Sequence, residues 1–263
     1  MKERRLPILP TLVAAYRDLG RVLMSLRTLI LCAFLILLAV SASVSLVPRN
    51  LWTRQWTAEA LDFAKVAAEA FLLAPIVIAI HRFVILDKVT RNYTVPIGEP
   101  AFVAFFGWLL ALKVLFGFPF TLLGVFQSLN WSVWATTSVF ALALIAAAAV
   151  MLRLTILLPA LAVEVPGATP SHALADTNGY ALRVLALFLL GLFPWIAGAF
   201  GVAVLLGRGA NVAGSPLGML SLILQGVLQT AATALIAVIA SYVFIALAAA
   251  VRRPARLQPQ TSS

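Results

Sequence analysis

The chain has 263 residues, of which 63% are hydrophobic and only 11% are charged, and its mean hydropathy is +1.05. A soluble domain is about half apolar and about a quarter charged, so this composition excludes a soluble fold and predicts that a lipid bilayer is the solvent. The net charge of +10 does not indicate nucleic-acid binding, because the basic residues stand at the ends of apolar runs, as in membrane orientation signals.

The first 27 residues form a cytoplasmic amphipathic segment ahead of the first long apolar run. Over residues 11–27, apolar or aromatic side chains recur at helical spacing against charged ones, namely Leu12, Tyr16, Leu19, Leu23 and Leu26 against Arg17, Asp18, Arg21 and Arg27. The pattern predicts a helix on the inner membrane face that leads into a first span over residues 28–47. A cleaved signal peptide is the alternative, since Ser41-Ala42-Ser43 resembles a cleavage site, but so long an amphipathic leader disfavours it.

Five more apolar runs are long enough to cross a bilayer, which takes about 20 residues. The second span ends near Leu86, the next three cover residues 101–126, 133–154 and 180–206, and the last begins after Ser215-Pro216 and ends near Val251. We therefore expect an all-α, polytopic bundle of about six transmembrane helices over residues 28–251. Thr169-Pro170 is a typical helix start and predicts a further, interfacial helix. Residues 252–263 are expected to form a disordered, basic cytoplasmic tail.

The basic residues divide unequally between the two sides of this arrangement. Of the 19 Lys and Arg residues, fourteen fall on one side (Lys2, Arg4, Arg5, Arg17, Arg21, Arg27, Arg82, Lys88, Arg91, Arg153, Arg183, Arg252, Arg253 and Arg256) and four on the other (Arg49, Arg54, Lys65 and Arg208). Because cytoplasmic loops carry the Lys and Arg excess, both termini are predicted to be cytoplasmic. Trp52, Trp56, Trp131 and Trp134 then fall at the outer interface, where aromatic belts form. Anionic headgroups of the inner leaflet are the predicted partners of Arg17, Arg21, Arg252, Arg253 and Arg256.

Lys113 is the most informative single residue, because it lies within the third span. A lysine near the centre of a helix costs about 2.5–3.5 kcal/mol on insertion scales, so its ammonium should face protein or water. Glu69, in the second span, lies at a depth that a lysine side chain can reach. The sequence therefore predicts a Lys113–Glu69 ion pair, which is either structural or part of a proton or anion site.

A polar stripe runs along the last span, consisting of Ser221, Gln225, Gln229 and Thr233 at successive i+4 positions. Lipid tails offer no hydrogen-bond partners, so this stripe is expected to turn into the bundle, for helix packing or to line a solute path. Pro119 and Pro194 stand within spans in similar Phe-Pro-aromatic contexts and predict kinks, which in transporters often mark a binding site.

Residues that could carry catalysis or hold a metal are sparse. The single cysteine, Cys32, lies in an apolar run and excludes a cysteine metal cluster, and the two histidines, His81 and His172, have no thiolate partner. Gly207-Arg208-Gly209 lacks the strand and the Lys-Ser/Thr of a phosphate-binding loop. We therefore expect no enzyme activity, no cofactor and no metal.

Two short motifs resemble a known family. Tyr16-Arg17-Asp18-Leu19-Gly20 ahead of the first span, and the run from Leu152 to Glu164 with its Leu-Pro-Ala stretch, are similar to the YciC-like bacterial inner-membrane proteins. They are also similar to the membrane domain attached to some glycerophosphodiester phosphodiesterases. A following helix-start motif matches at Thr177, Gly179 and Arg183 but has Tyr180 where Asn is usual. The resemblance implies an inner-membrane protein linked to envelope or lipid homeostasis, without the soluble catalytic domain.

Two functions from different classes fit these observations. The first is a non-enzymatic membrane protein that acts by association with lipids or with other membrane proteins, as an accessory subunit or an envelope factor. The alternative is a small transporter of a lipid or an anionic solute, whose path includes Lys113 and the polar stripe. A polar cavity that reaches Lys113 would favour transport, and a solid apolar bundle would favour association.

Overall fold

The structure, a computed structural model, describes residues 6–45, 55–206 and 215–248, and these residues form helices and connecting loops without any strand. The helices are α1 (Ile8–Ser25), α2 (Arg27–Ser45), α4 (Gln55–Leu86), α5 (Pro100–Ser128), α6 (Val133–Leu154), α7 (Leu157–Ala162), α8 (Pro170–Asp176), α9 (Ala181–Leu206) and α10 (Pro216–Leu247). The prediction of an all-α bundle is confirmed.

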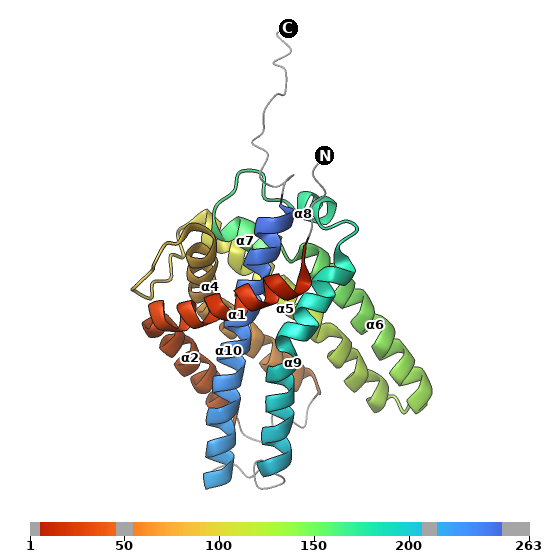
Figure 1. The fold of residues 1–263 in the computed structure, drawn as a ribbon. Helices are drawn as coiled ribbons and strands as arrows, with labels where there is room; N and C mark the ends of the chain where they lie inside the picture. Colours follow the sequence, from red (N-terminus) through yellow and green to blue (C-terminus); the bar gives the residue numbers. More distant parts are fainter. Residues whose placement is uncertain (1–5, 46–54, 207–214, 249–263) are drawn as a thin grey trace.

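Five helical stretches are long and apolar enough to cross a membrane, namely 59–86, 100–128, 133–162, 181–206 and 216–247. A sixth span is formed only if α1 and α2, which meet at a 90° bend, are taken together. Figure 1 shows α1 crossing the front of α10, while α9 and α10 run side by side toward the lower end. The chain is therefore a multi-pass membrane protein, and α1 lies across the spans rather than along them.

Most element boundaries follow local signals in the sequence. The α6 bounds are those predicted, and α5 and α9 begin within one residue of the prediction. The two predicted cap-and-proline starts are present: the Thr169 hydroxyl accepts from the His172 N–H, and the Ser215 hydroxyl accepts from the Gly218 N–H. The predicted end of the last span near Val251 lies outside the described residues.

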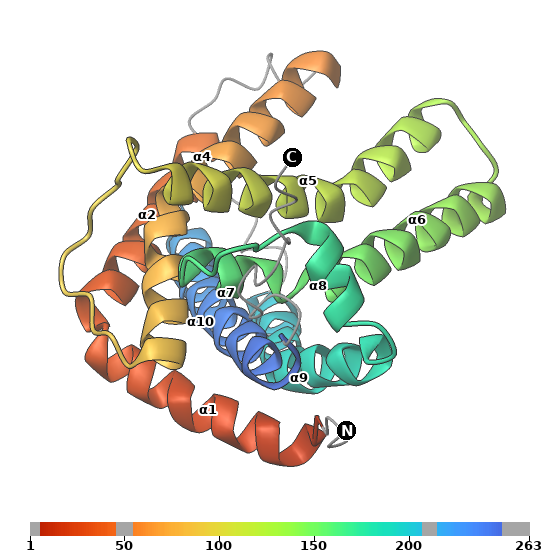
Figure 2. The same cartoon turned by 90° about the horizontal axis from the view of Figure 1, so that it is seen from above.

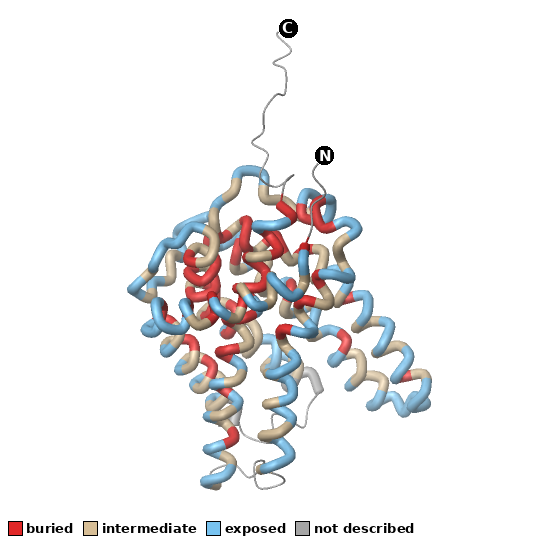
Figure 3. The backbone as a smooth tube through the Cα atoms, in the orientation of Figure 1, coloured by how far each residue is buried: buried red, intermediate tan, exposed pale blue. Residues whose placement is uncertain are grey.

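The packed core is concentrated at the end of the bundle that holds α7 and α8, hereafter the α7 end. Figure 3 shows that buried residues gather there, whereas the helices toward the opposite, distal end are mostly exposed. On α10, every residue from Ala234 to Leu247 except Ile236, Ile245 and Ala246 is buried or half-buried. Figure 2, seen from above, shows the α5–α6 hairpin extending away from the other helices. In a bilayer the exposed apolar side chains of these distal segments face lipid or a partner.

Three prolines lie inside spanning helices, and the helices continue through them. Pro119 in α5 and Pro194 in α9 are those predicted, and Pro75 in α4 is a third that the sequence analysis did not single out. Each removes one backbone N–H from the helical ladder and leaves a carbonyl one turn earlier without its donor.

Candidate functional site

Lys113 and Glu69 form the predicted ion pair. The Lys113 Nζ lies 3.1 Å from the Glu69 Oε2, with the side chain of Glu69 8% exposed and that of Lys113 31% exposed. The hairpin of α4 and α5 brings the two charges together at similar depth. A charge-assisted hydrogen bond of this kind compensates two groups that would each be costly alone in hydrocarbon.

The ion pair stands at one end of an open cavity of about 800 Å³, hereafter the Lys113 groove, between the distal halves of α4 and α5. Exposed aromatic side chains form much of its apolar wall, among them Phe63, Phe118 and Phe120. Polar groups line it from Glu59 and Asp62 on α4 to Ser128 on α5. The groove is therefore amphipathic, with an apolar wall and charged groups toward both of its ends.

Two glycines of α5 keep the groove open. Gly117 and Gly124 both line it, and a Cβ built on either residue would meet no atom within 4 Å. A larger side chain at these positions would therefore enter the groove without displacing the bundle. Gly107, on the same helix but outside the groove, has the same free space around its Cα and offers a matched comparison.

Charged side chains of both signs line the groove. Lys113 is the one basic residue among the described residues that line the groove, and its charge is balanced by Glu69. Glu59 and Asp62 remain as the other charged groups of the lining.

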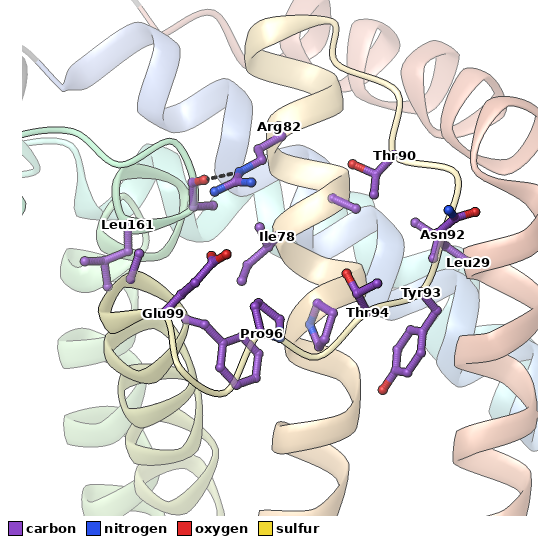
Figure 4. A pocket seen from close by; sticks show the side chains of 15 residues that line it. Leu29, Ile78, Arg82, Thr90, Asn92, Tyr93, Thr94, Pro96, Glu99 and Leu161 are labelled. Atoms are coloured by element: carbon purple, nitrogen blue, oxygen red, sulfur yellow. Dashed lines mark hydrogen bonds between the residues drawn. The ribbon is translucent and has the colours of Figure 1, made fainter.

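A second, smaller cavity of about 80 Å³ lies on the same two helices toward the α7 end (Figure 4). The α4–α5 loop closes it with Thr90, Asn92, Tyr93 and Thr94, and Arg82 of α4 lies at its upper edge. The Arg82 Nε donates to the Ala162 carbonyl oxygen at 2.7 Å, and its guanidinium also pairs with Glu164. Arg82 therefore ties α4 to the end of α7 rather than presenting a free charge to the cavity.

Aromatic rings separate the two cavities. The ring of Phe71 on α4 packs edge-on against Phe102 and Phe106 on α5, with centroid separations of 5.8 and 5.4 Å. Phe102 itself lines the smaller cavity, and Phe71 and Phe106 lie between that cavity and the Lys113–Glu69 pair along the two helices. The two cavities are thus not continuous.

The polar stripe of α10 does not turn inward as a whole, so that prediction is wrong. Ser221 is buried and Thr233 half-buried, but Gln225 and Gln229 are exposed. Successive i+4 positions drift by about 40° around a helix, so four such residues cannot share one narrow face. The buried polar residues of α10 are instead Ser221, Thr230 and Ser241.

The face of α1 also differs from the prediction, which placed Asp18 with the arginines on a polar side. Asp18 is buried and accepts a hydrogen bond from the Tyr242 hydroxyl at 2.7 Å and from Arg21 at 3.3 Å. Arg21 also pairs with Asp87 at 3.2 Å. Leu9, Val13 and Met24 are instead the strongly exposed side chains of α1. Arg17, Arg21 and Arg27 are exposed and Leu19 and Leu26 are buried, as predicted, so the buried Asp18 and the exposed Leu23 are the departures from the amphipathic pattern.

The remaining predicted headgroup contacts are not tested by the structure. Arg17 is 73% exposed and therefore accessible to headgroups, whereas Arg21 already shares its charge with two carboxylates. Arg252, Arg253 and Arg256 lie outside the described residues. The contact of all five with anionic lipid stays a prediction.

His81 is a buried residue rather than an interfacial one. Its Nδ1 lies 2.8 Å from the Ser241 Oγ, and the Ser241 hydroxyl donates to the Ala237 carbonyl oxygen, so Nδ1 carries the proton in this arrangement. Within the described ranges, no three His, Cys, Asp or Glu side chains come together as metal ligands. His81 links α4 to α10, and its pairing with a serine 160 residues away could not be read from local sequence.

Comparison of the chain with protein-family models, with curated proteins and with solved structures found no match. The fold defines the class, a multi-pass α-helical membrane protein. The resemblance to YciC-like proteins rests on its two short motifs and stays a prediction.

Proposed function

We propose that the protein is a non-enzymatic, multi-pass protein of the bacterial inner membrane, with cytoplasmic termini, that acts by binding a membrane amphiphile in the Lys113 groove. The observation that carries the proposal is the groove itself, an amphipathic cavity of about 800 Å³ that ends at a charged pair within the spans. Its volume falls in the range of about 300–1,000 Å³ that is typical of small-molecule sites.

The length of the groove fits one lipid leaflet. From Glu59 to Glu69, α4 rises about 15 Å, which is half of a hydrocarbon core of about 30 Å. The exposed rings of Phe63, Phe118 and Phe120 need an apolar neighbour. An acyl chain of a bound amphiphile, lying along the groove, would supply that contact in place of the surrounding bulk lipid. An amphiphile of the leaflet next to the distal end is therefore the ligand class that matches the shape.

The charges indicate which headgroup is accepted. Glu59 and Asp62 lie at the groove end away from the Lys113–Glu69 pair, near the start of the spanning part of α4, where a headgroup would stand in a bilayer. A neutral, zwitterionic or cationic headgroup suits the exposed Asp62 carboxylate better than an anionic one does. The proposal is thus a site for an amine-bearing or neutral lipid rather than for an anion.

Native mass spectrometry of the full-length protein, released from nanodiscs that contain phosphatidylethanolamine and phosphatidylglycerol, tests the proposal. We expect wild-type protein to retain phosphatidylethanolamine in preference to phosphatidylglycerol. Gly124→Phe, which fills the groove, should lose at least tenfold of the retained lipid. Gly107→Phe, on the same helix but outside the groove, should retain it.

Circular dichroism and thermal unfolding of both variants check that each remains folded. Equal lipid retention by Gly124→Phe, Gly107→Phe and wild type would overturn the proposal, as would preferential retention of the anionic lipid.

Transport is a second candidate, favoured by the small cavity of mixed polar and apolar lining that lies beyond the Phe71 ring on the same two helices. If the rings are a barrier between two accessible cavities, Phe71→Ala should raise lipid movement between leaflets in proteoliposomes above the wild-type rate. An unchanged rate of lipid movement between leaflets would count against transport, and lipid binding would then be the only function proposed.

A further inference from the structure

The last span carries a face that the bundle covers only in part. Six of its residues follow one another at spacings of four and three, three of them half-buried (Gly218, Leu222 and Ala232) and three exposed (Gln225, Gln229 and Ile236). Their average spacing of about 3.6 residues keeps them on one face of a straight α-helix, along which another helix can pack. The face, hereafter the α10 seam, is about 27 Å long and so runs through most of a hydrocarbon core of about 30 Å.

Gln229 stands near the centre of the seam without a partner for its amide. Two other polar side chains of α10 are satisfied within the helix: Gln225 donates to the Ser221 hydroxyl at 2.9 Å, and Thr233 donates to the Gln229 carbonyl oxygen at 2.8 Å. The Gln229 amide makes no side-chain hydrogen bond within the part of the chain that the structure describes.

Gln229 lies well inside the last candidate span, about 20 Å along the helix from Pro216 and about 27 Å from Leu247. In a bilayer its short side chain would therefore stand among lipid tails wherever no protein covers it. An amide that faces lipid tails at this depth is costly, because the tails offer neither donor nor acceptor.

We infer that the α10 seam binds the α10 seam of a second copy of this chain, with Gln229 opposite Gln229 across a two-fold axis along the membrane normal. A carboxamide has both a donor and an acceptor, so two glutamines related by such an axis satisfy each other. Gly218 and Ala232, on the same face, are small and allow the helices to approach closely. A polar residue within an otherwise apolar seam also fixes the register and the number of helices.

Cysteine cross-linking of the full-length protein in liposomes tests the inference. In a Cys32→Ser background, single cysteines at positions 225, 229 and 236 should form disulfide-linked dimers on oxidation. Val227→Cys and Ile223→Cys, at positions that are also exposed on α10 but lie off the seam, should not. Cross-linking of equal efficiency on and off the seam would overturn the inference.

The role of the amide is tested by the monomer–dimer equilibrium, measured by single-molecule photobleaching at decreasing protein-to-lipid ratios. Gln229→Leu should raise the dimer dissociation constant about tenfold, the loss expected for two interhelical hydrogen bonds, and Val227→Leu should leave it unchanged. Gln229→Asn keeps both donor and acceptor and should largely preserve the dimer. The pairing would be refuted if the wild type were monomeric or if Gln229→Leu dimerised as the wild type does. It would also be refuted if a different, co-purifying protein occupied the seam. Lipid retention in the Lys113 groove is a separate measurement and does not depend on this outcome.

Discussion

The hydroxyl of Tyr16 donates a 2.6 Å hydrogen bond to the carbonyl oxygen of Gly191, across 175 residues of sequence. Gly191 lies three residues before Pro194 in α9. Pro194 has no backbone N–H, so the turn of helix that precedes it lacks one hydrogen bond. The loop residue Tyr93 repeats the relationship in α4, where its hydroxyl donates to the Leu72 carbonyl oxygen at 2.9 Å, three residues before Pro75. In both helices a tyrosine from another segment supplies a donor to the turn that a proline weakens.

Removing the first of these hydroxyls should loosen the contact of α1 with α9. Tyr16→Phe keeps the ring but deletes the donor, and we expect a loss of about 1 kcal/mol in the free energy of unfolding. Unfolding in mixed micelles measures the loss. The double variant Tyr16→Phe/Pro194→Ala provides the control. If the Tyr16 hydroxyl stabilises the turn that Pro194 weakens, the losses in unfolding free energy of the two single variants will not add up to that of the double variant.

Tyr93 predicts a dependence on alkaline pH. Burial raises the pKa of the Tyr93 phenol above its ordinary value of 10.0, and the neighbouring Cys32 adds to the shift. Because the folded pKa is the higher one, the stability that this phenol contributes is complete below pH 10 and is lost as the pH rises through the folded pKa. The stability difference between wild type and Tyr93→Phe should therefore shrink above pH 10. A difference that stays constant between pH 8 and pH 11 would contradict this.

The Lys113–Glu69 pair should show energetic coupling as well as proximity. Lys113→Met leaves a carboxylate without its partner at a position where only 8% of the side chain is exposed, so it should destabilise strongly in the wild-type background. In a Glu69→Gln background the same change should cost less, giving a coupling of about 1–3 kcal/mol in a double-mutant cycle. Strictly additive effects would show that the contact contributes no stability.

Asp18 should be more important for docking α1 than any arginine on that helix. Asp18→Ala removes the acceptor of the Tyr242 hydroxyl, and a hydrogen bond to a charged group is worth about 1.5–3 kcal/mol. Hydrogen exchange of α1 amides should increase in Asp18→Ala and in Tyr242→Phe. Arg17→Ala, which alters an exposed side chain of the same helix, is the control and should leave exchange unchanged.

The predicted topology can be decided by cysteine accessibility in intact cells, in a Cys32→Ser background. Asn130→Cys, in the turn between α5 and α6, should react with an impermeant reagent added outside, and Gln258→Cys in the tail should not. The reverse labelling would place the termini outside and invert the orientation derived from the basic residues.

The sequence by itself determined the class of protein and most of its helices. Apolar runs that are long enough to cross a bilayer almost always form spanning helices, because backbone N–H and C=O groups without hydrogen bonds are too costly in lipid. Local caps at Thr169 and Ser215 set two helix starts. The Lys113–Glu69 pair was also predictable, since two charges at matching depth on consecutive helices have few other partners.

Tertiary structure alone decided which faces are covered. The orientation of α1 depends on Asp18 meeting Tyr242, 224 residues away, and His81 is buried because α10 brings Ser241 to it. The polar stripe of α10 was wrongly predicted to turn inward for the same reason: helical periodicity shows that a face is polar, but not which neighbours stand beside it. The Lys113 groove likewise exists because the distal halves of α4 and α5 separate, and no local residue pattern encodes the distance between two helices.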